Sequence, residues 1–180
     1  MYIETARRMG TAIAERGLGL VYGGGRIGLM GAVADAAMAA GAEVIGVIPE
    51  ALALKEVAHG GLTQLHVVQT MHQRKAMMAE MADAFIAMPG GYGTFEEFCE
   101  VLTWSQLSMH TKPCGLLNVE GYYDPFLNLL DHATVEGFVR PSHRALVLNE
   151  CDPHCLLERL AAWRPPANNG IEKWITQSET

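Results

Sequence analysis

The sequence has few basic residues and no long uninterrupted apolar run. Its 180 residues carry 13 Lys plus Arg against 20 Asp plus Glu, which gives a formal net charge of -7. This balance argues against a broad nucleic-acid surface, although a few basic residues can still bind one small anion. Charged residues such as Asp35 and Glu43 interrupt the apolar stretches well before the ~20 residues that a membrane-spanning helix needs. We therefore expect a small-molecule ligand, with neither a nucleic acid nor a membrane as partner.

The sequence also lacks paired cysteine and histidine motifs. None of the four cysteines has disulfide or zinc-site spacing, so reduced thiols in a cytoplasmic protein are the expectation. The first eight residues already contain an acid and do not have the pattern of a signal peptide. The group Cys151-Asp-Pro-His154-Cys155 resembles a metal site, but Asp152 and Pro153 also suit the start of a helix. We therefore predict no metal ion.

Short apolar strands alternate with helical segments along most of the chain. The predicted strands are 18–22, 43–48, 65–68, 84–88, 114–119 and 145–148. The predicted helices are 2–16, 28–40, 71–81, 94–108, 124–136 and 153–162. This alternation predicts an α/β, Rossmann-like fold with an open, mostly parallel sheet and helices on both faces. We expect a single domain over residues 1–163 and a peripheral tail over residues 164–180, because a Pro- and Asn-rich run begins at Arg164.

The stretch from Phe85 to Glu97 combines a strand, a glycine turn and a helix start. Pro89 ends the strand, Gly90, Gly91 and Gly93 form the turn, and Thr94 is expected to open the helix. The unpaired N–H groups and the positive dipole end of such a helix attract an anion, and glycine lets a phosphate come close. Glu97 lies one turn further in on the same side as Thr94, so a carboxylate stands beside the anion. We expect chemistry on a phosphorylated small molecule; alternatively, Glu96 and Glu97 merely favour the helix N-terminus.

A second glycine turn, Gly23, Gly24 and Gly25, follows the first predicted strand. It leads into a helix and a second strand, so the two strands should be parallel with a right-handed crossover. The turn differs from a dinucleotide fingerprint, because the glycine spacing is wrong and no acid follows at the distance that reads a ribose. We regard it as a secondary glycine loop and expect no nicotinamide cofactor.

Arg74 and Lys75 follow a helix start after Thr70. In open α/β sheets the carboxyl ends of the strands form the ligand crevice, so this helix start and the Pro89–Thr94 loop should face one cleft. Arg74 and Glu97 would then meet there, where a guanidinium suits phosphate or sugar hydroxyls. The alternative is an exposed basic pair on an amphipathic helix.

The helix predicted over residues 94–108 is apolar on two sides. One stripe, expected to face the core, comprises Phe95, Phe98, Cys99 and Leu102. Val101 and Trp104 project from the opposite side at ~100° per residue. This pattern predicts a second partner, the same helix of another protomer, with a pocket built from two chains. The alternative is burial under the chain's own Tyr122–Tyr123 loop.

These motifs together resemble the signature of the Lonely-guy (LOG) family, the cytokinin riboside 5'-monophosphate phosphoribohydrolases, formerly labelled lysine decarboxylases. The resemblance rests on Pro89-Gly-Gly-x-Gly-Thr-x-x-Glu97 and Met71-x-x-Arg-Lys75, and it extends from about Tyr2 to about Leu160. Further matching segments are Val21–Gly25, Gly28–Gly31, Val44–Pro49, Lys112–Pro113 and Gly121–Pro125.

The resemblance implies hydrolysis of the N-glycosidic bond of an N6-substituted adenosine 5'-monophosphate, which releases free base and ribose 5-phosphate. It implies no cofactor, a homodimer or larger homo-oligomer, and Arg74 and Glu97 as the catalytic pair. The implied substrate contacts are Glu56, Arg74, Lys75, Gly90, Gly91, Tyr92, Gly93, Thr94, Phe95, Glu96, Glu97 and Thr103.

One feature departs from the family, and two other functions compete with hydrolysis. Family members usually begin with a strand that ends in a Gly-Ser-Ser type turn, and no such strand precedes the first helix here; we expect a gap near the middle of the sheet.

The main rival is a nucleotide or cofactor carrier that uses the same phosphate loop without turnover. A pyridoxal-phosphate decarboxylase is disfavoured, because a chain this short lacks room for the usual two-domain cofactor cleft.

Overall fold

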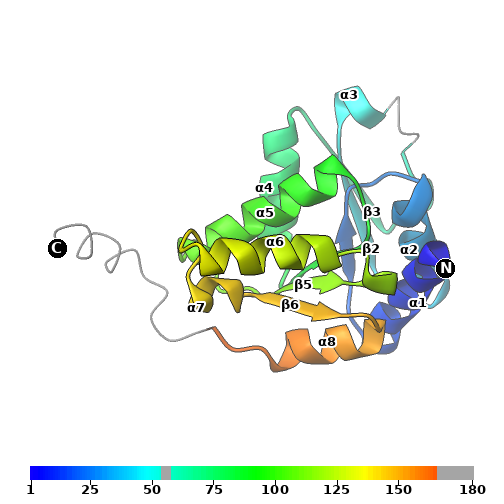
Figure 1. Ribbon diagram of the computed structural model, residues 1–180. Helices are drawn as coiled ribbons and strands as arrows, with labels where there is room; N and C mark the ends of the chain where they lie inside the picture. The colour runs from blue at the N-terminus through cyan, green and yellow to red at the C-terminus, as the bar shows by residue number, and fades with distance from the viewer. Residues whose placement is uncertain (54–57, 166–180) are drawn as a thin grey trace. The chain divides into compact units, whose positions relative to one another are not determined.

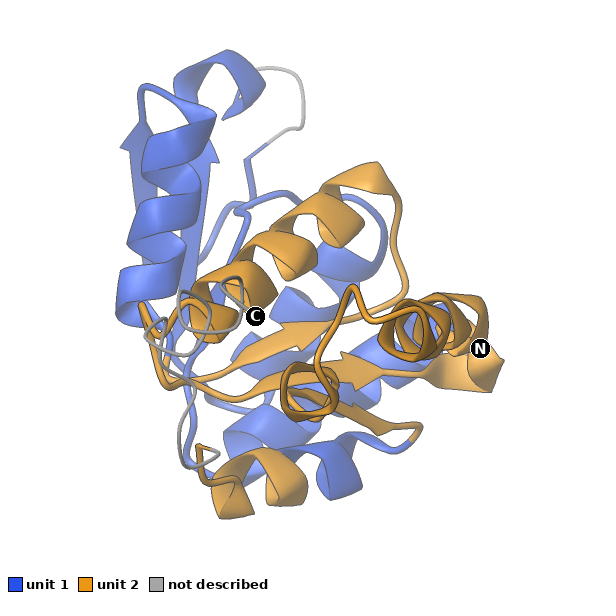
Figure 2. Cartoon of the chain, turned by 60° about the vertical axis from the view of Figure 1, so that its left-hand side comes forward, with its two compact units in different colours: residues 1–82, 152–157 blue, residues 83–151, 158–180 orange. Residues whose placement is uncertain are grey.

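The computed structural model describes residues 1–53 and 58–165, which form two compact units (Figures 1 and 2). Unit 1 comprises Met1–Ala82 and Asp152–Leu157, and unit 2 comprises Asp83–Cys151 together with the described residues from Glu158 onward. The predicted single domain over residues 1–163 remains a prediction. Glu56, and all but the first two residues of the predicted tail, lie outside the described residues.

Unit 1 holds a three-stranded parallel sheet in the order β1-β2-β3. Its elements are α1 (Tyr2–Glu15), β1 (Leu20–Tyr22), α2 (Gly28–Ala39), β2 (Val44–Pro49), α3 (Glu50–Ala53), β3 (Gln64–Val68) and α4 (Met71–Met81). The parallel pairing predicted for the first two strands is confirmed, because Leu20 pairs with Val44 and Tyr22 with Gly46. The buried faces of α2 and β2 pack around Tyr22, which places the core of this unit beside the strand that leads into the secondary glycine loop.

Helices α1 and α2 pack unusually closely at Gly10. A Cβ at position 10 would overlap the carbonyl oxygen of Val33 and lie 2.8 Å from the backbone nitrogen of Ala37. Neighbouring small or flexible side chains on α1, among them Ala6 and Met9, are buried in the same contact. The two helices therefore approach each other backbone to backbone, which only glycine allows at this position.

Unit 2 holds a second three-stranded parallel sheet, in the order β4-β5-β6. Its elements are β4 (Phe85–Ala87), α5 (Tyr92–Gln106), β5 (Cys114–Leu117), the 3-10 turn η1 (Val119–Gly121), α6 (Asp124–Val135), α7 (Pro141–Arg144), β6 (Val147–Glu150) and the second half of α8 (Pro153–Ala162). Helix α6 lies along one side of β5 and β6 (Figure 1). The α/β class with parallel strands flanked by helices is confirmed.

Several predicted boundaries needed correction. Helix α5 begins at Tyr92 and ends at Gln106, two residues before the prediction at both ends, and the last strand is 147–150 where 145–148 was predicted. The short helices α3 and α7 were not predicted. Within the described part of the chain, no helix combines the length and the apolar character needed to cross a bilayer.

The core-facing side of α5 also differs from the prediction. Val101 packs against the buried cluster of unit 2, whereas Cys99 is exposed. The centre of the buried side runs through Phe98 and Ser105, seven residues apart and 5% and 3% exposed. At ~100° per residue, this centre brings Val101 inward and turns Cys99 outward. The side assigned to Val101 was therefore wrong, and Trp104 is half-buried.

We predict that Gly10→Ala lowers the free energy of unfolding by about 1–3 kcal/mol, because the added methyl group must push α1 away from α2. Thermal unfolding followed by circular dichroism measures the effect. Gly60→Ala is the matched control, because a Cβ there meets no atom within 4 Å and the glycine does not need a positive φ. Equal melting temperatures for the two variants would contradict the packing argument.

Candidate functional site

The loop between β4 and α5 leaves a helix N-terminus without a side-chain cap. Gly91 is the N-cap residue, and it makes no side-chain cap hydrogen bond to the first turn. The first backbone bond of the helix runs from the Phe95 N–H to the Gly91 carbonyl, at 3.1 Å. The N–H groups that precede Phe95 are those that a helix start leaves to water or to a ligand. The helix start is therefore uncapped by a side chain of its N-cap residue, and the anion site expected there remains a prediction.

The glycines of this loop serve two different needs. A Cβ at Gly90 would overlap the Thr94 hydroxyl, so that glycine is required by the packing of the loop on its own helix. Gly91 and Gly93 have nothing within 4 Å of the place where a Cβ would be. They leave the helix start open, which lets a phosphate approach the backbone.

Two tyrosines that sequence reasoning did not assign to the loop bind its carbonyl groups. The Tyr123 hydroxyl donates to the Met88 carbonyl at 2.6 Å, and the Tyr122 hydroxyl donates to the Gly90 carbonyl at 2.5 Å. Both tyrosines belong to the Gly121–Pro125 motif, which was considered as part of the family resemblance and as a cover for the helix over residues 94–108, but not as a partner of the glycine loop. Their sequence position after β5, the neighbour of β4 in the sheet, was the available signal.

The acidic residues of α5 differ in burial. Glu97 is half-buried in the second turn, and Glu96 is exposed. The pKa of the nearby Cys99 thiol is raised by partial burial and, to a smaller extent, by the Glu96 carboxylate. Glu97 is therefore less exposed than Glu96 near the helix start, and its catalytic role remains a prediction.

Two residues that are predicted to contact the substrate make contacts with other residues of unit 2. Phe95 packs against the core of the unit, with its ring stacked 6.2 Å from that of Phe126. The Thr103 hydroxyl donates to the Cys99 carbonyl at 2.8 Å within the helix. These contacts give both residues structural roles, and their part in substrate binding stays a prediction.

Arg74 is a buried arginine that holds two backbone carbonyl groups. Its side chain is on α4, which begins with a capping box between Thr70 and Gln73. Its Nε donates to the Val47 carbonyl and its Nη2 to the Gly23 carbonyl, both at 3.1 Å, and the residue is 7% exposed. The alternative of an exposed basic pair is therefore wrong for Arg74, while Lys75 beside it is half-buried.

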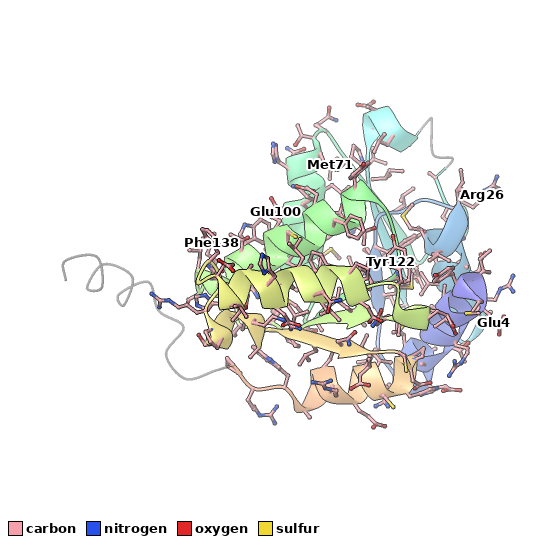
Figure 3. All side chains as sticks on the ribbon, in the orientation of Figure 1. Glu4, Arg26, Met71, Glu100, Tyr122 and Phe138 are labelled. Carbon is pink, nitrogen blue, oxygen red and sulfur yellow. The ribbon has the colours of Figure 1, made fainter. Side chains whose placement is uncertain are left out.

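The secondary glycine loop depends on this arginine. A Cβ at Gly23 would overlap Nη2 of Arg74, so glycine is needed for the guanidinium to reach the carbonyl oxygens. Nη1 of the same guanidinium lies 3.4 Å from the sulfur of Met71, which is labelled in Figure 3 at the start of α4. Arg74 thus joins the ends of β1 and β2 to α4.

His59 fixes the other side of the secondary glycine loop. Its backbone N–H donates to the Gly24 carbonyl at 3.0 Å, and its ring nitrogens lie 2.8 Å from the Gly60 carbonyl oxygen and 3.0 Å from Oδ1 of Asp35. Gly24 has a φ of +74°, which glycine adopts without strain. Sequence reasoning missed this role of His59, because the contact with Asp35 joins residues 24 positions apart.

The predicted site residues thus fall into two groups. Gly90 to Glu97 and Thr103 belong to unit 2, and Gly23 to Gly25, Arg74 and Lys75 belong to unit 1. The predicted meeting of Arg74 with Glu97 remains a prediction. Among the side chains that the structure describes, no three His, Cys, Asp or Glu residues are grouped so that they could hold a metal ion.

Comparison with known proteins links this chain to one group of relatives. A family model described as "Possible lysine decarboxylase" matches residues 30–160. A cytokinin riboside 5'-monophosphate phosphoribohydrolase of Rhodococcoides fascians is 60% identical over 148 residues, which cover 82% of this chain and 75% of the relative. A protein of the same name from Oryza sativa subsp. japonica is 48% identical over 170 residues, which cover 94% of this chain and 70% of the relative.

Solved structures with the same fold are more distant in sequence. The molybdenum cofactor carrier protein of Chlamydomonas reinhardtii has a TM-score of 0.67 at 22% identity, with 90% of this chain and 89% of that chain covered. The molybdenum cofactor binding protein of Rippkaea orientalis has a TM-score of 0.66 at 21% identity, with 89% and 86% covered. At this identity the likeness concerns the fold alone.

We predict that Gly23→Ala destabilises the chain by about 2–4 kcal/mol, because the methyl group displaces a buried guanidinium from two carbonyl oxygens. Urea unfolding measures the loss. Gly19→Ala is the control, because a Cβ there lies 3.5 Å from its nearest neighbour, which is ordinary contact. A Gly23→Ala variant as stable as Gly19→Ala would show that Arg74 does not need its two carbonyl partners.

Proposed function

We propose that this chain, which belongs to the Lonely-guy (LOG) family, is an N-glycosyl hydrolase of nucleoside 5'-monophosphates. The family model that it matches is described as "Possible lysine decarboxylase". The open, glycine-rich start of α5, with the Glu97 carboxylate one turn further along, is the observation that carries this proposal. The names of the relatives support the same activity and suggest an adenosine 5'-monophosphate with a substituent on N6 as substrate. The products would be free base and ribose 5-phosphate.

The proposed reaction adds water across the bond between C1' of the ribose and N9 of the base. The bond breaks with its electron pair going to the base, which takes up a proton at N9, and the ribose passes through an oxocarbenium-like state. Water then attacks C1' and loses a proton. The Glu97 carboxylate would stabilise the developing positive charge or orient the attacking water. The N–H groups from Gly91 to Thr94 would hold the 5'-phosphate.

Arg74 also has a role in the proposed reaction. Its guanidinium already binds the carbonyl groups of Gly23 and Val47, so it offers a positive charge at a fixed position. We expect such a charge to act on sugar or phosphate in both the ground state and the transition state. Lys75, Glu56 and Thr103 complete the substrate contacts suggested by the family resemblance.

A carrier that binds a nucleotide or cofactor without turnover is the main rival. The two molybdenum cofactor proteins share only the fold with this chain, so they do not favour the carrier. A pure anion binder gains nothing from a carboxylate near the phosphate, whereas a hydrolase can use that charge on a cationic ribose. Glu97 therefore favours the hydrolase.

Replacement of Glu97 distinguishes the two functions. Glu97→Gln should leave the dissociation constant of adenosine monophosphate nearly unchanged, while base release falls by a factor on the order of 10² or more. Calorimetric titration and a base-release assay give the two quantities. Glu96→Gln is the matched control, because Glu96 is exposed ~100° around the helix and should lose less activity. Undiminished hydrolysis by Glu97→Gln would remove Glu97 from the catalytic pair and favour the carrier.

We also propose a homodimer that uses the outer side of α5. With Val101 packed inward, the half-buried Trp104 and the 39% exposed Leu107 are apolar residues that a partner helix could cover. Trp104→Glu should convert the dimer to a monomer in analytical ultracentrifugation, because a carboxylate in an apolar contact loses its hydration. Phe138→Glu is the control, since Phe138 is 84% exposed and lies away from α5 in the sequence. A dimer that survives Trp104→Glu but not Phe138→Glu would place the contact elsewhere.

A further inference from the structure

The turn that joins β5 to α6 is built to hold two tyrosines in place. The Asn118 side chain donates to Oδ1 of Asp124 at 2.7 Å and accepts from the Tyr123 N–H at 2.7 Å. The backbone of Glu120 and Gly121 has φ angles of 53° and 71°, so the chain reverses sharply between these bonds. An asparagine and an aspartate thus close a rigid turn around the tyrosine pair. Tyr122 is labelled in Figure 3 beside the start of α6.

The two hydroxyl groups bind the phosphate loop on either side of Pro89. Tyr123 is 1% exposed and donates to Met88, whereas Tyr122 is 36% exposed and donates to Gly90. Their rings meet edge to face, with centroids 5.1 Å apart. Burial, and to a smaller extent the neighbouring Tyr122, raises the pKa of Tyr123, so its hydroxyl keeps the proton that it donates.

The Tyr122 bond has a geometric consequence for the anion site. In a trans peptide the C=O and the N–H point in opposite directions, so the Gly90 carbonyl and the Gly91 N–H are turned together. Both residues that flank this peptide are glycines, and their backbone torsions rotate more freely than those of other residues. Without a partner for the carbonyl, the peptide could turn its oxygen toward the phosphate. A hydrogen bond from Tyr122 opposes that rotation.

The Tyr123 bond differs in this respect. Its acceptor, the Met88 carbonyl, belongs to the peptide bond with Pro89, and proline has no N–H to present. Tyr123 therefore orients no donor toward a ligand. Its hydroxyl and ring belong to the buried cluster of unit 2, so its contribution is to stability.

We propose that Tyr122 is a positioning residue that holds the Gly90–Gly91 peptide with its N–H toward the 5'-phosphate of the substrate. The inference rests on the proposed function and assigns a residue that acts on phosphate affinity through the loop. Binding of the phosphate group, and not of the nucleoside, would then depend on Tyr122. The expected class of ligand is any nucleoside 5'-monophosphate that enters the loop.

The test compares Tyr122→Phe with Tyr123→Phe in the full chain. Tyr122→Phe keeps the half-exposed ring and should weaken adenosine monophosphate binding about 3- to 10-fold, the equivalent of one hydrogen bond. Adenosine affinity and melting temperature should stay near the parent values, and in the base-release assay KM should rise while kcat changes little. Tyr123→Phe should lower the melting temperature and change the ratio of the two affinities less.

The possible outcomes separate this inference from the proposed hydrolase. An unchanged adenosine monophosphate affinity for Tyr122→Phe would overturn the inference, as would an equal loss of affinity for adenosine. A parent protein that binds adenosine monophosphate but releases base neither from it nor from an N6-substituted adenosine monophosphate would defeat the hydrolase, while calorimetry would still decide the role of Tyr122. A parent that binds neither adenosine monophosphate nor inorganic phosphate would overturn both.

Discussion

The open backbone at the start of α5 is the constraint on which the candidate site depends. A helix start leaves its first backbone N–H groups without partners inside the helix, and Gly91, at the N-cap, has no side chain that could accept a hydrogen bond from them; the proposed anion site needs these groups open. The carbonyl groups of the same loop must then be bound elsewhere, since a free carbonyl would repel the anion. Tyr122 and Tyr123 bind two of them from outside the loop.

The carbonyl groups of the secondary glycine loop in unit 1 are also bound by residues from outside the loop. Gly23 and Gly24 also present carbonyl groups, and these are bound by the Arg74 guanidinium and by the His59 backbone. An arginine that is 7% exposed needs several acceptors, because burial removes the water that would otherwise surround its charge. The loop and the arginine therefore depend on each other, and a side chain at Gly23 would disturb both.

The fold and the chemistry have separate physical origins in this chain. Parallel strands with helix crossovers bring glycine turns to the carboxyl ends of β1 and β4, and a molybdenum cofactor carrier protein has the same fold. A carboxylate near the anion is a feature that a binder has no use for, whereas a hydrolase that passes through a cationic ribose does. The proposed function therefore rests on Glu97 and on the names of the chain's relatives more than on the fold.

The sequence by itself determined the class of fold and the helices whose ends carry local signals. The start of α4 at Met71 follows from the Thr70–Gln73 capping box, and α8 begins where Asp152 and Pro153 predict. The start of α5 was missed, because Tyr92 and Gly93 are poor helix signals and the loop is held by hydroxyls from another segment. Tertiary structure alone decided that Val101 faces inward, that Arg74 is buried, and that Tyr122, Tyr123 and His59 bind the glycine loops. These are contacts between residues far apart in the chain, and no local spacing in the sequence encodes them.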